Sequence, residues 1–300
     1  MRRWIAGAVA VSALAVAGPA FAQAKPADPV ATLKKQFVAG QGVKLTEHTS
    51  IMVGRESYTQ ADRQGVIGFD AKGIAGAENT RTPILTEKER ARLEKMAAKD
   101  ASISDSVDLL TERIYLVSVG KHMYVNGGLY STLMPENKSW IGMNGSPSSA
   151  AYGDQLINVF EPATLKYLLA KTKTVRGAQY RGSVTFAELY KVSPTFREQI
   201  ATKPTGKPAR TVISWRLTLD AQKLVKRLAI SWSMRVTKKV TLSATTESRY
   251  TEWGTAVNVT APPADQVADL KALMKKAPEP PAAIDRNYVS VPPDDDGNTE

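Results

Sequence analysis

Few residues of this chain have the types and spacing that catalysis or metal binding requires. The chain has only two histidines, His48 and His122, and no cysteine. A zinc or iron site would therefore need carboxylates with at most two histidines, and no His-Glu-x-x-His sequence is present. We expect both histidines to be surface residues of strands, and we predict no metal site and no cofactor.

Hydroxyl and carboxylate clusters are the next candidates. A serine nucleophile usually lies in Gly-x-Ser-x-Gly, which the segment GSPSS at 145–149 does not match. We expect a flexible loop there, at a rim or a lid hinge. No phosphate-binding loop or dinucleotide fingerprint occurs. The acidic run 294–296 lacks the fixed loop of calcium sites, so we expect a solvated segment. The sequence thus predicts a protein that is not an enzyme.

The most informative pattern is apolar. In residues 213–220 and 227–235, apolar and polar residues alternate with a period of two, which indicates two half-buried β-strands. Trp215 and Trp232 make the apolar face broad. Such a sheet must cover its apolar face. The cover is either the core of the protein itself or a bound lipid, and the alternation alone fits both.

The two ends of the chain differ in composition from its body. Residues 1–22 have a basic start, a short apolar stretch and small residues before the end, as secretory signal peptides do, so we predict cleavage after Ala22. The apolar stretch is too short to span a bilayer. Because no cysteine follows it, we expect a secreted, extracytoplasmic protein of the cell envelope without a lipid anchor. Residues 23–276 form the predicted domain, and the Pro- and Asp-rich residues 277–300 are a predicted disordered tail.

The charge of the chain is unevenly distributed. The whole chain has a formal net charge of +11, whereas residues 23–276 carry 37 basic and 23 acidic side chains, a net of +14. The tail, with six acids and one arginine, has a net charge of −5. A basic body is attracted to anionic surfaces. For an exported protein we expect an anionic membrane surface or cell-wall polymers rather than nucleic acid; the alternative is that the charge serves only solubility.

Periodicity and turn residues predict a single α+β domain with a long antiparallel sheet of about eight to eleven strands. An N-cap at Asp28 and a capping box at Thr86 and Glu89 mark two helix starts. The predicted helices span residues 29–39, 86–98, 154–160, 162–172, 196–201 and 265–275. The main predicted strands, besides the pair above, span residues 43–53, 65–70, 74–79, 114–117, 123–125, 139–143, 178–190, 240–250 and 253–260, with a hairpin turn at 126–128.

The order of these elements resembles a known family. The segments that carry the resemblance are DPVATLKKQFVAG, VKLTEHTSIMV, IYLVSVGKHMYVNGG, FEPATLKYLLAKT, WRLTLDAQKLVKRLAISW and RYTEWGTAVNVTAPPADQVADL, which together cover roughly residues 28–275. The chain resembles the LolA-like lipid carriers of the periplasm and cell envelope, especially the actinobacterial LppX/LprG-type proteins. It departs from them in lacking the lipoprotein cysteine and in having the charged helix 86–98 and the acidic tail.

The resemblance implies a strongly curved antiparallel sheet, a half-barrel, with helices across its open face. It also implies that lipid or lipoprotein acyl chains bind between them, in a carrier or chaperone. Basic residues at the mouth, Lys171, Arg216 or Arg227, could then hold an anionic head group. The predicted lining of the cavity is Ile67, Phe69, Ile114, Leu116, Met123, Val125, Trp140, Leu165, Leu168, Leu169, Trp215, Leu217, Leu228, Ile230 and Trp232.

Two alternatives remain open from the sequence. The same apolar residues could pack against the protein's own helices and leave no cavity. The domain would then be an exported sensor or a protein-interaction module on the same fold, without lipid transfer, and the acidic tail and charged helix would be contact elements.

Overall fold

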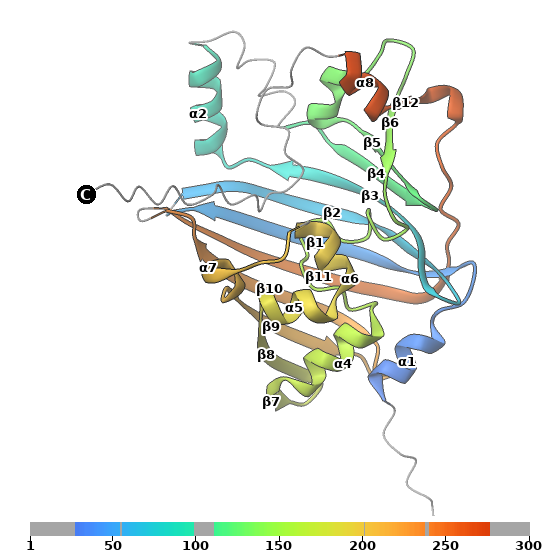
Figure 1. The fold of residues 1–300 in the computed structure, drawn as a ribbon, viewed down its shortest axis with the longest axis vertical. Helices are drawn as coiled ribbons and strands as arrows, with labels where there is room; N and C mark the ends of the chain where they lie inside the picture. The colour runs from blue at the N-terminus through green and yellow to red at the C-terminus, as the bar shows by residue number, and fades with distance from the viewer. Residues whose placement is uncertain (1–27, 55, 99–110, 201, 238–239, 277–300) are drawn as a thin grey trace, which may run out of the picture.

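A computed structural model describes residues 28–54, 56–98, 111–200, 202–237 and 240–276 (Figure 1). The predicted signal peptide and tail lie outside these residues. The described chain builds one sheet whose strands are β1 (Gln41–Val53), β2 (Glu56–Asp70), β3 (Gly73–Ile84), β4 (Ile114–Val119), β5 (His122–Asn126), β6 (Trp140–Asn144), β7 (Thr172–Arg176), β8 (Gln179–Thr185), β9 (Val212–Leu219), β10 (Val225–Arg235), β11 (Thr241–Ala256) and β12 (Val267–Asp269).

The twelve strands follow the order β12-β6-β5-β4-β3-β2-β1-β11-β10-β9-β8-β7. All neighbours are antiparallel except β12, which runs parallel to β6. The sheet is strongly curved and remains open, with β12 and β7 at its two edges (Figure 1). The predicted fold class is therefore confirmed, with one strand more than the expected range. The longest strands, β1, β2 and β11, lie in the middle of the sheet.

Short helices cover one face of this sheet. The helices are α1 (Pro29–Lys35), α2 (Glu87–Ala97), η1 (Gly128–Leu133), α4 (Pro162–Ala170), α5 (Phe186–Val192), α6 (Pro194–Ile200), α7 (Gly206–Ala209), η2 (Ala264–Gln266) and α8 (Leu270–Lys276). Figure 1 shows α4, α5 and α6 lying across β8–β11 on the same side of the sheet. We call the face under these helices, which carries Leu45, Leu217 and Leu228, the inner face. The opposite face, which carries Arg216 and Arg249, is the outer face.

The segment between β6 and α4, residues 145–161, is the main departure from the predicted elements. Residues 154–160 do not form a helix. They run across the inner face, and side chains at both odd and even positions are buried. Two amides explain this path. The Asn158 side chain accepts the backbone N–H of Phe160 at 2.8 Å, and Gln155 accepts that of Ile157 at 3.4 Å. Such local bonds compete with the helical backbone pattern. We call residues 145–161 the strap.

Other predicted boundaries also differ. The strand predicted over 178–190 ends at Thr185, because Thr185 and Glu188 form a capping box that starts α5. The Gly-rich turn at 126–128 leads into η1 rather than directly into a strand. The two strands predicted over 240–260 are the single strand β11.

The terminal helices are shorter than predicted. Helix α1 starts at the Asp28 cap as expected but ends at Lys35, and the segment predicted as a helix from 265 begins with η2 and β12. The capping box at Thr86 and the charged helix that it starts are confirmed, with α2 ending at Ala97.

Candidate functional site: the covered inner face

The inner face of β9 and β10 is a continuous apolar surface. Across these two strands Trp215 lies opposite Ile230, and Leu217 lies opposite Leu228. Period-two alternation puts all four on one side, where each is at most 3% exposed. Two tryptophans and several branched residues make this surface wide, which was the feature predicted from the alternation.

Helices α4, α5 and α6 cover that surface with a small number of apolar residues. Leu165, Leu168, Leu189 and Phe196 are each at most 1% exposed. Phe186 connects the helices to the sheet, since its ring centroid lies 5.3 Å from Phe196 and 5.8 Å from that of Trp232. The cover consists of separate helices of seven to nine residues, so each is held mainly by tertiary packing rather than by its own helical stability.

The strap fills the neighbouring part of the inner face with aromatic contacts. The Phe160 ring lies 5.1 Å from Tyr250, edge to face, and 5.7 Å from both Phe69 and Trp253. Burial raises the pKa of the Tyr250 phenol, and the nearby carboxylate of Glu47 raises it further. The phenol therefore stays neutral and packs as part of the core.

A buried ion pair fixes the strap to the sheet. Arg63 on β2 and Glu47 on β1 have side chains 3% and 2% exposed, with a closest N–O distance of 2.9 Å. The guanidinium also donates to the backbone oxygens of Ala150 at 3.1 Å and Ala151 at 3.3 Å. Ser248 donates to the same Glu47 oxygen, Oε2, at 2.7 Å, while Arg63 Nε donates to Oε1 at 3.0 Å. Every polar contact of this pair is directed to the sheet or the strap, so the pair pins an irregular segment in place.

A glycine makes room for this ion pair. A Cβ atom at Gly153 would lie 2.7 Å from Arg63 Nε and 3.1 Å from Glu47 Oε1, so a side chain there would displace the pair. Further bonds hold the strap on either side: the Asn79 amide donates to the Ala150 oxygen at 2.5 Å, and Ser118 donates to the Pro147 oxygen at 2.7 Å. Polar groups of the sheet thus hold the backbone of the strap, and its apolar side chains pack against the inner face.

At the edge of the cover, an ion pair and a hydrogen bond connect α4 to α5. Glu188 of α5 accepts the Lys171 ammonium at 3.0 Å and the Tyr167 hydroxyl at 3.1 Å. Its bonds from Thr185 and Lys171 lower the pKa of Glu188 to about 2. Lys171, predicted at the mouth of a cavity, is therefore paired within the cover.

The structure places fourteen of the fifteen predicted lining residues in or against two apolar clusters. The larger lies under the strap and helices and includes Ile67, Phe69, Leu165, Leu168, Trp215, Leu217, Leu228, Ile230 and Trp232, with Leu116 and Leu169 packed against it. The smaller lies between β4–β6 and α8 and includes Val125, with Ile114 and Met123 packed against it. Trp140 is half-buried and belongs to neither of these clusters. Their role as ligand contacts stays a prediction.

Two of the predicted head-group residues are placed differently from the prediction. Arg216 and Arg227 lie on the outer face, because they alternate with Trp215 and Leu228. They therefore cannot stand at the mouth of an inner-face cavity.

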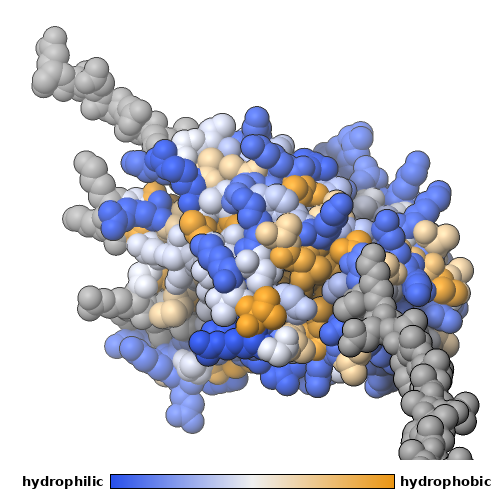
Figure 2. Space-filling model, turned by 90° about the horizontal axis from the view of Figure 1, so that it is seen from below, coloured by the Kyte–Doolittle hydropathy of each residue, from blue (hydrophilic) through white to orange (hydrophobic). Residues whose placement is uncertain are grey.

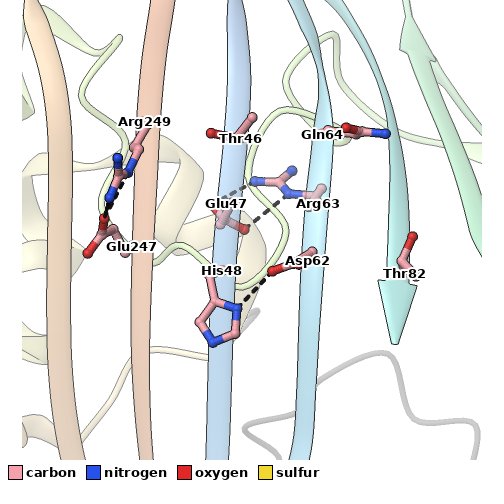
Figure 3. Close-up of a pocket in the computed structure, with 9 residues that line it drawn as sticks. All are labelled: Thr46, Glu47, His48, Asp62, Arg63, Gln64, Thr82, Glu247 and Arg249. Carbon is pink, nitrogen blue, oxygen red and sulfur yellow. Dashed lines mark hydrogen bonds and ion pairs between the residues drawn. The ribbon is translucent and has the colours of Figure 1, made fainter. Parts of the chain in front are cut away.

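Two polar hollows lie on the described surface, and none of the fifteen residues lines either of them. One lies over β1, β2, β3 and β11, where Figure 3 shows His48 reaching Asp62 on the adjacent strand at 2.8 Å. Both side chains are more than half exposed, so His48 is the surface strand residue that was expected. The second hollow lies over β7–β9.

Sequence reasoning did not find the buried polar groups of the site. Glu47 and Arg63 are charged residues at inward positions of β1 and β2, and this break in the apolar alternation was the available signal. Within the described ranges no group of three or more His, Asp or Glu side chains could hold a metal ion. In the same ranges no helix is long and apolar enough to cross a membrane.

Comparisons with known proteins give likenesses of chain path only. No family model and no curated protein matches the chain. Among solved structures it is similar to a LolA superfamily protein from Nitrosomonas europaea, with 6% identity, a TM-score of 0.26 and coverage of 78% of this chain and 93% of that one. It is also similar to a DUF1329 family protein from Desulfovibrio piger, with 12% identity, a TM-score of 0.28 and coverage of 78% and 96%. Likeness at this level specifies neither a ligand nor an activity.

Proposed function

We propose that this protein is an exported carrier or chaperone of the cell envelope, without enzymatic activity. It would bind lipid or lipoprotein acyl chains between the inner face of the sheet and the layer of helices and strap. The resemblance of the sequence to LolA-like carriers, including the finer LppX/LprG-type likeness, motivates the proposal. The secretory signal predicted at residues 1–22 would deliver the protein to the envelope.

One observation carries the proposal: a continuous apolar wall is covered by short, separate helices and an irregular segment. The wall is the apolar inner face of the paired strands β8, β9 and β10, with Trp215, Leu217 and Leu228 at its centre. The cover is made of short helices and the irregular strap, which packs on the wall through side chains. An acyl chain would replace apolar contacts of the cover with its own.

The energies of this exchange are compatible with reversible binding. Each buried methylene contributes about 0.8 kcal/mol, so a chain with about fourteen buried methylenes gains roughly 11 kcal/mol. Opening the cover costs part of this gain, because the affinity is reduced by the fraction of molecules in the open state.

One buried polar group of the wall could donate a hydrogen bond to an ester. The indole N–H of Trp215, a residue only 3% exposed, has no hydrogen-bond partner among the described residues. A buried donor without a partner costs about 1–3 kcal/mol. The carbonyl oxygen of an acyl ester bound along β9 would accept this bond and remove the cost.

The covered inner face is also the observation that favours the second candidate. With the apolar wall packed against the protein's own side chains, the fold is complete without a ligand. The protein would then be an exported sensor or interaction module on the same fold.

Native mass spectrometry of the mature protein secreted from a bacterial host, followed by solvent extraction, separates the two functions. The carrier is expected to hold about one phospholipid, glycolipid or acyl chain per molecule or to take it up when lipid is added. A clean unliganded mass with no uptake would refute the carrier and leave the interaction module.

Single-tryptophan variants locate the bound chain. A spin-labelled fatty acid should quench the fluorescence of Trp215 and Trp232, which lie on the wall. Trp253, which packs against the strap, is the reference within the same core. Quenching at Trp140 would show that the bound chain extends toward the second cluster; equal weak quenching at all sites would contradict an inner-face site.

A further inference from the structure

The outer face of β7–β10 carries only one sign of charge. These four strands contain seven lysines and arginines and no aspartate or glutamate. The basic residues are Lys173, Arg176, Arg181, Arg216, Lys226, Arg227 and Arg235. A single-sign surface of this kind is an electrostatic footprint for an anionic partner.

Like charges face each other across these strands. Arg181 lies opposite Arg216 on adjacent strands, and Arg227 lies opposite Arg249. The second pair is compensated, because Glu247 forms ion pairs with both Arg227 and Arg249. Neither Arg181 nor Arg216 forms an ion pair within the described chain, and the guanidinium of Arg181 donates only to the Gln179 amide oxygen. Directly opposed like charges destabilise a sheet, so an anion bound between Arg181 and Arg216 would relieve their repulsion.

A hollow lies beside this arginine pair. Its lining contains Lys173 and Arg181 together with the hydroxyls of Thr174, Ser183 and Ser214. A guanidinium binds phosphate through two parallel hydrogen bonds, an ammonium adds a point charge, and hydroxyls donate to the remaining oxygens. The donor set therefore matches a phosphate ester rather than a metal ion.

The surface around the hollow is formed mainly by short side chains. A row of short hydroxyl side chains crosses the outer face, with Ser183 opposite Ser214, Ser214 opposite Ser231 and Ser231 opposite Thr245. One exposed apolar residue of the outer face, Val212 at 47% exposure, also lines this hollow. Figure 2 shows the β7 end of the molecule, next to this face, where hydrophilic side chains project with hydrophobic residues between them. Such a mixture suits the interface of a bilayer, where basic groups meet headgroups and small apolar groups enter between them.

We propose that the outer face of β7–β10 docks the protein on membranes that contain anionic phospholipids, with Arg181 and Arg216 as the principal contacts. This proposal deepens the proposed carrier function, because it brings the strands that bear Trp215 and Leu228 on their other face to the source or acceptor of the lipid. The partner is a bilayer surface, and free phosphates and nucleic acid are tested as competitors.

The test is co-sedimentation of the full mature chain with vesicles. Binding is expected to vesicles that contain phosphatidylglycerol, to be absent with pure phosphatidylcholine, and to weaken with salt. Each lost cation should lower the affinity about fivefold, so Arg181→Gln with Arg216→Gln should lower it about 25-fold. The matched control is Lys34→Gln with Lys35→Gln, the same charge change on exposed positions of α1, and it should lower binding less than fivefold.

Several results would overturn the proposal. They are no binding to anionic vesicles, equal losses in both double variants, and tighter binding to glycerol phosphate or to DNA than to vesicles. The lipid content of the same variants, measured by native mass spectrometry, keeps the two proposals apart. Docking without a bound lipid would refute the carrier only, whereas a bound lipid without docking would refute the outer-face site only.

Discussion

The two faces of β9 and β10 differ in both burial and charge. Trp215 and Arg216 are adjacent in the sequence, yet one is 3% exposed under the helices and the other lies in solvent opposite a second arginine. On the inner face of β1 and β2, in the same sheet, Glu47 and Arg63 form a buried ion pair that is hydrogen-bonded to the sheet and the strap. On the outer face two arginines face each other without an acid.

This difference separates two ways of using charge in one sheet. The inner pair positions a segment of the chain itself, so removing it should cost stability. The outer arginines position nothing within the described structure, so removing them should cost binding but not stability. The following changes test that contrast, from the largest expected effect on stability to the smallest.

Breaking the buried ion pair should have the largest effect. Arg63→Met leaves the carboxylate of Glu47 buried beside the strap without its cation. We expect a loss of about 3–5 kcal/mol in the free energy of unfolding, measured by urea denaturation. Replacing both partners, Glu47→Gln with Arg63→Met, should recover part of the loss, because no charge then remains unpaired.

An exposed ion pair on β1 is the matched control. Lys44 and Glu252 are 2.7 Å apart but are 50% and 55% exposed. Lys44→Gln should cost less than about 1 kcal/mol. Similar costs for Lys44→Gln and Arg63→Met would show that the strap is not held by the buried pair.

Truncating the apolar wall should have the next largest effect. Leu228 is fully buried between strands and cover, so Leu228→Ala should lower the free energy of unfolding by about 2–5 kcal/mol. Ser231→Ala, three residues further along on the outer face, should change it by less than about 0.5 kcal/mol. If Leu228→Ala were as mild as Ser231→Ala, the inner face would be loosely packed and the cover easily opened.

The wall was predictable from sequence and the cover was not. Alternation specifies which side of a strand is apolar, so β9, β10 and their buried residues follow directly from residues 213–220 and 227–235. The capping residues at Asp28 and Thr86 likewise mark the starts of α1 and α2, because the cap is a local bond. These features depend on residues close together in the chain.

The strap depends on residues that are far apart in the chain. Its apolar residues fit a helix over 154–160, but Thr246 of β11 donates to the backbone oxygen of Asp154 and Gln199 of α6 donates to that of Gln155. Arg63 of β2 holds the strap a few residues earlier, at the Ala150 oxygen. The ion pair itself joins β1 to β2 and has no local sequence signature. A single sequence shows neither the partners nor the register that brings them together, so the covered site could not be predicted in detail.

The pH dependence of the cover gives a smaller effect. The pKa of Glu188 is lowered to about 2 by its bonds from Thr185 and Lys171, so its ionised form stabilises the folded state. This contribution is complete above the unfolded pKa of about 4.3 and is lost as the pH falls toward the folded value. Because a third of the side chain is exposed, we expect roughly 1–2 kcal/mol. Melting curves of Glu188→Gln and the native protein should differ at neutral pH and converge near the folded pKa; a constant difference would contradict this role.

Neutralising the outer arginines should have the smallest effect on stability, and its sign should be opposite. Arg216→Gln removes one of two like charges that lie directly across from each other on β8 and β9, and repulsion of this kind costs about 0.2–1 kcal/mol. The variant should therefore be slightly more stable than the native protein in urea, although it binds anionic vesicles more weakly. Arg249→Gln is the informative comparison, because Arg249 is paired with Glu247 and its loss should bring no gain. A clear loss of stability in Arg216→Gln would mean that this arginine has a structural partner. The proposed contrast between stabilising inner charges and unpaired outer charges would then be wrong for Arg216.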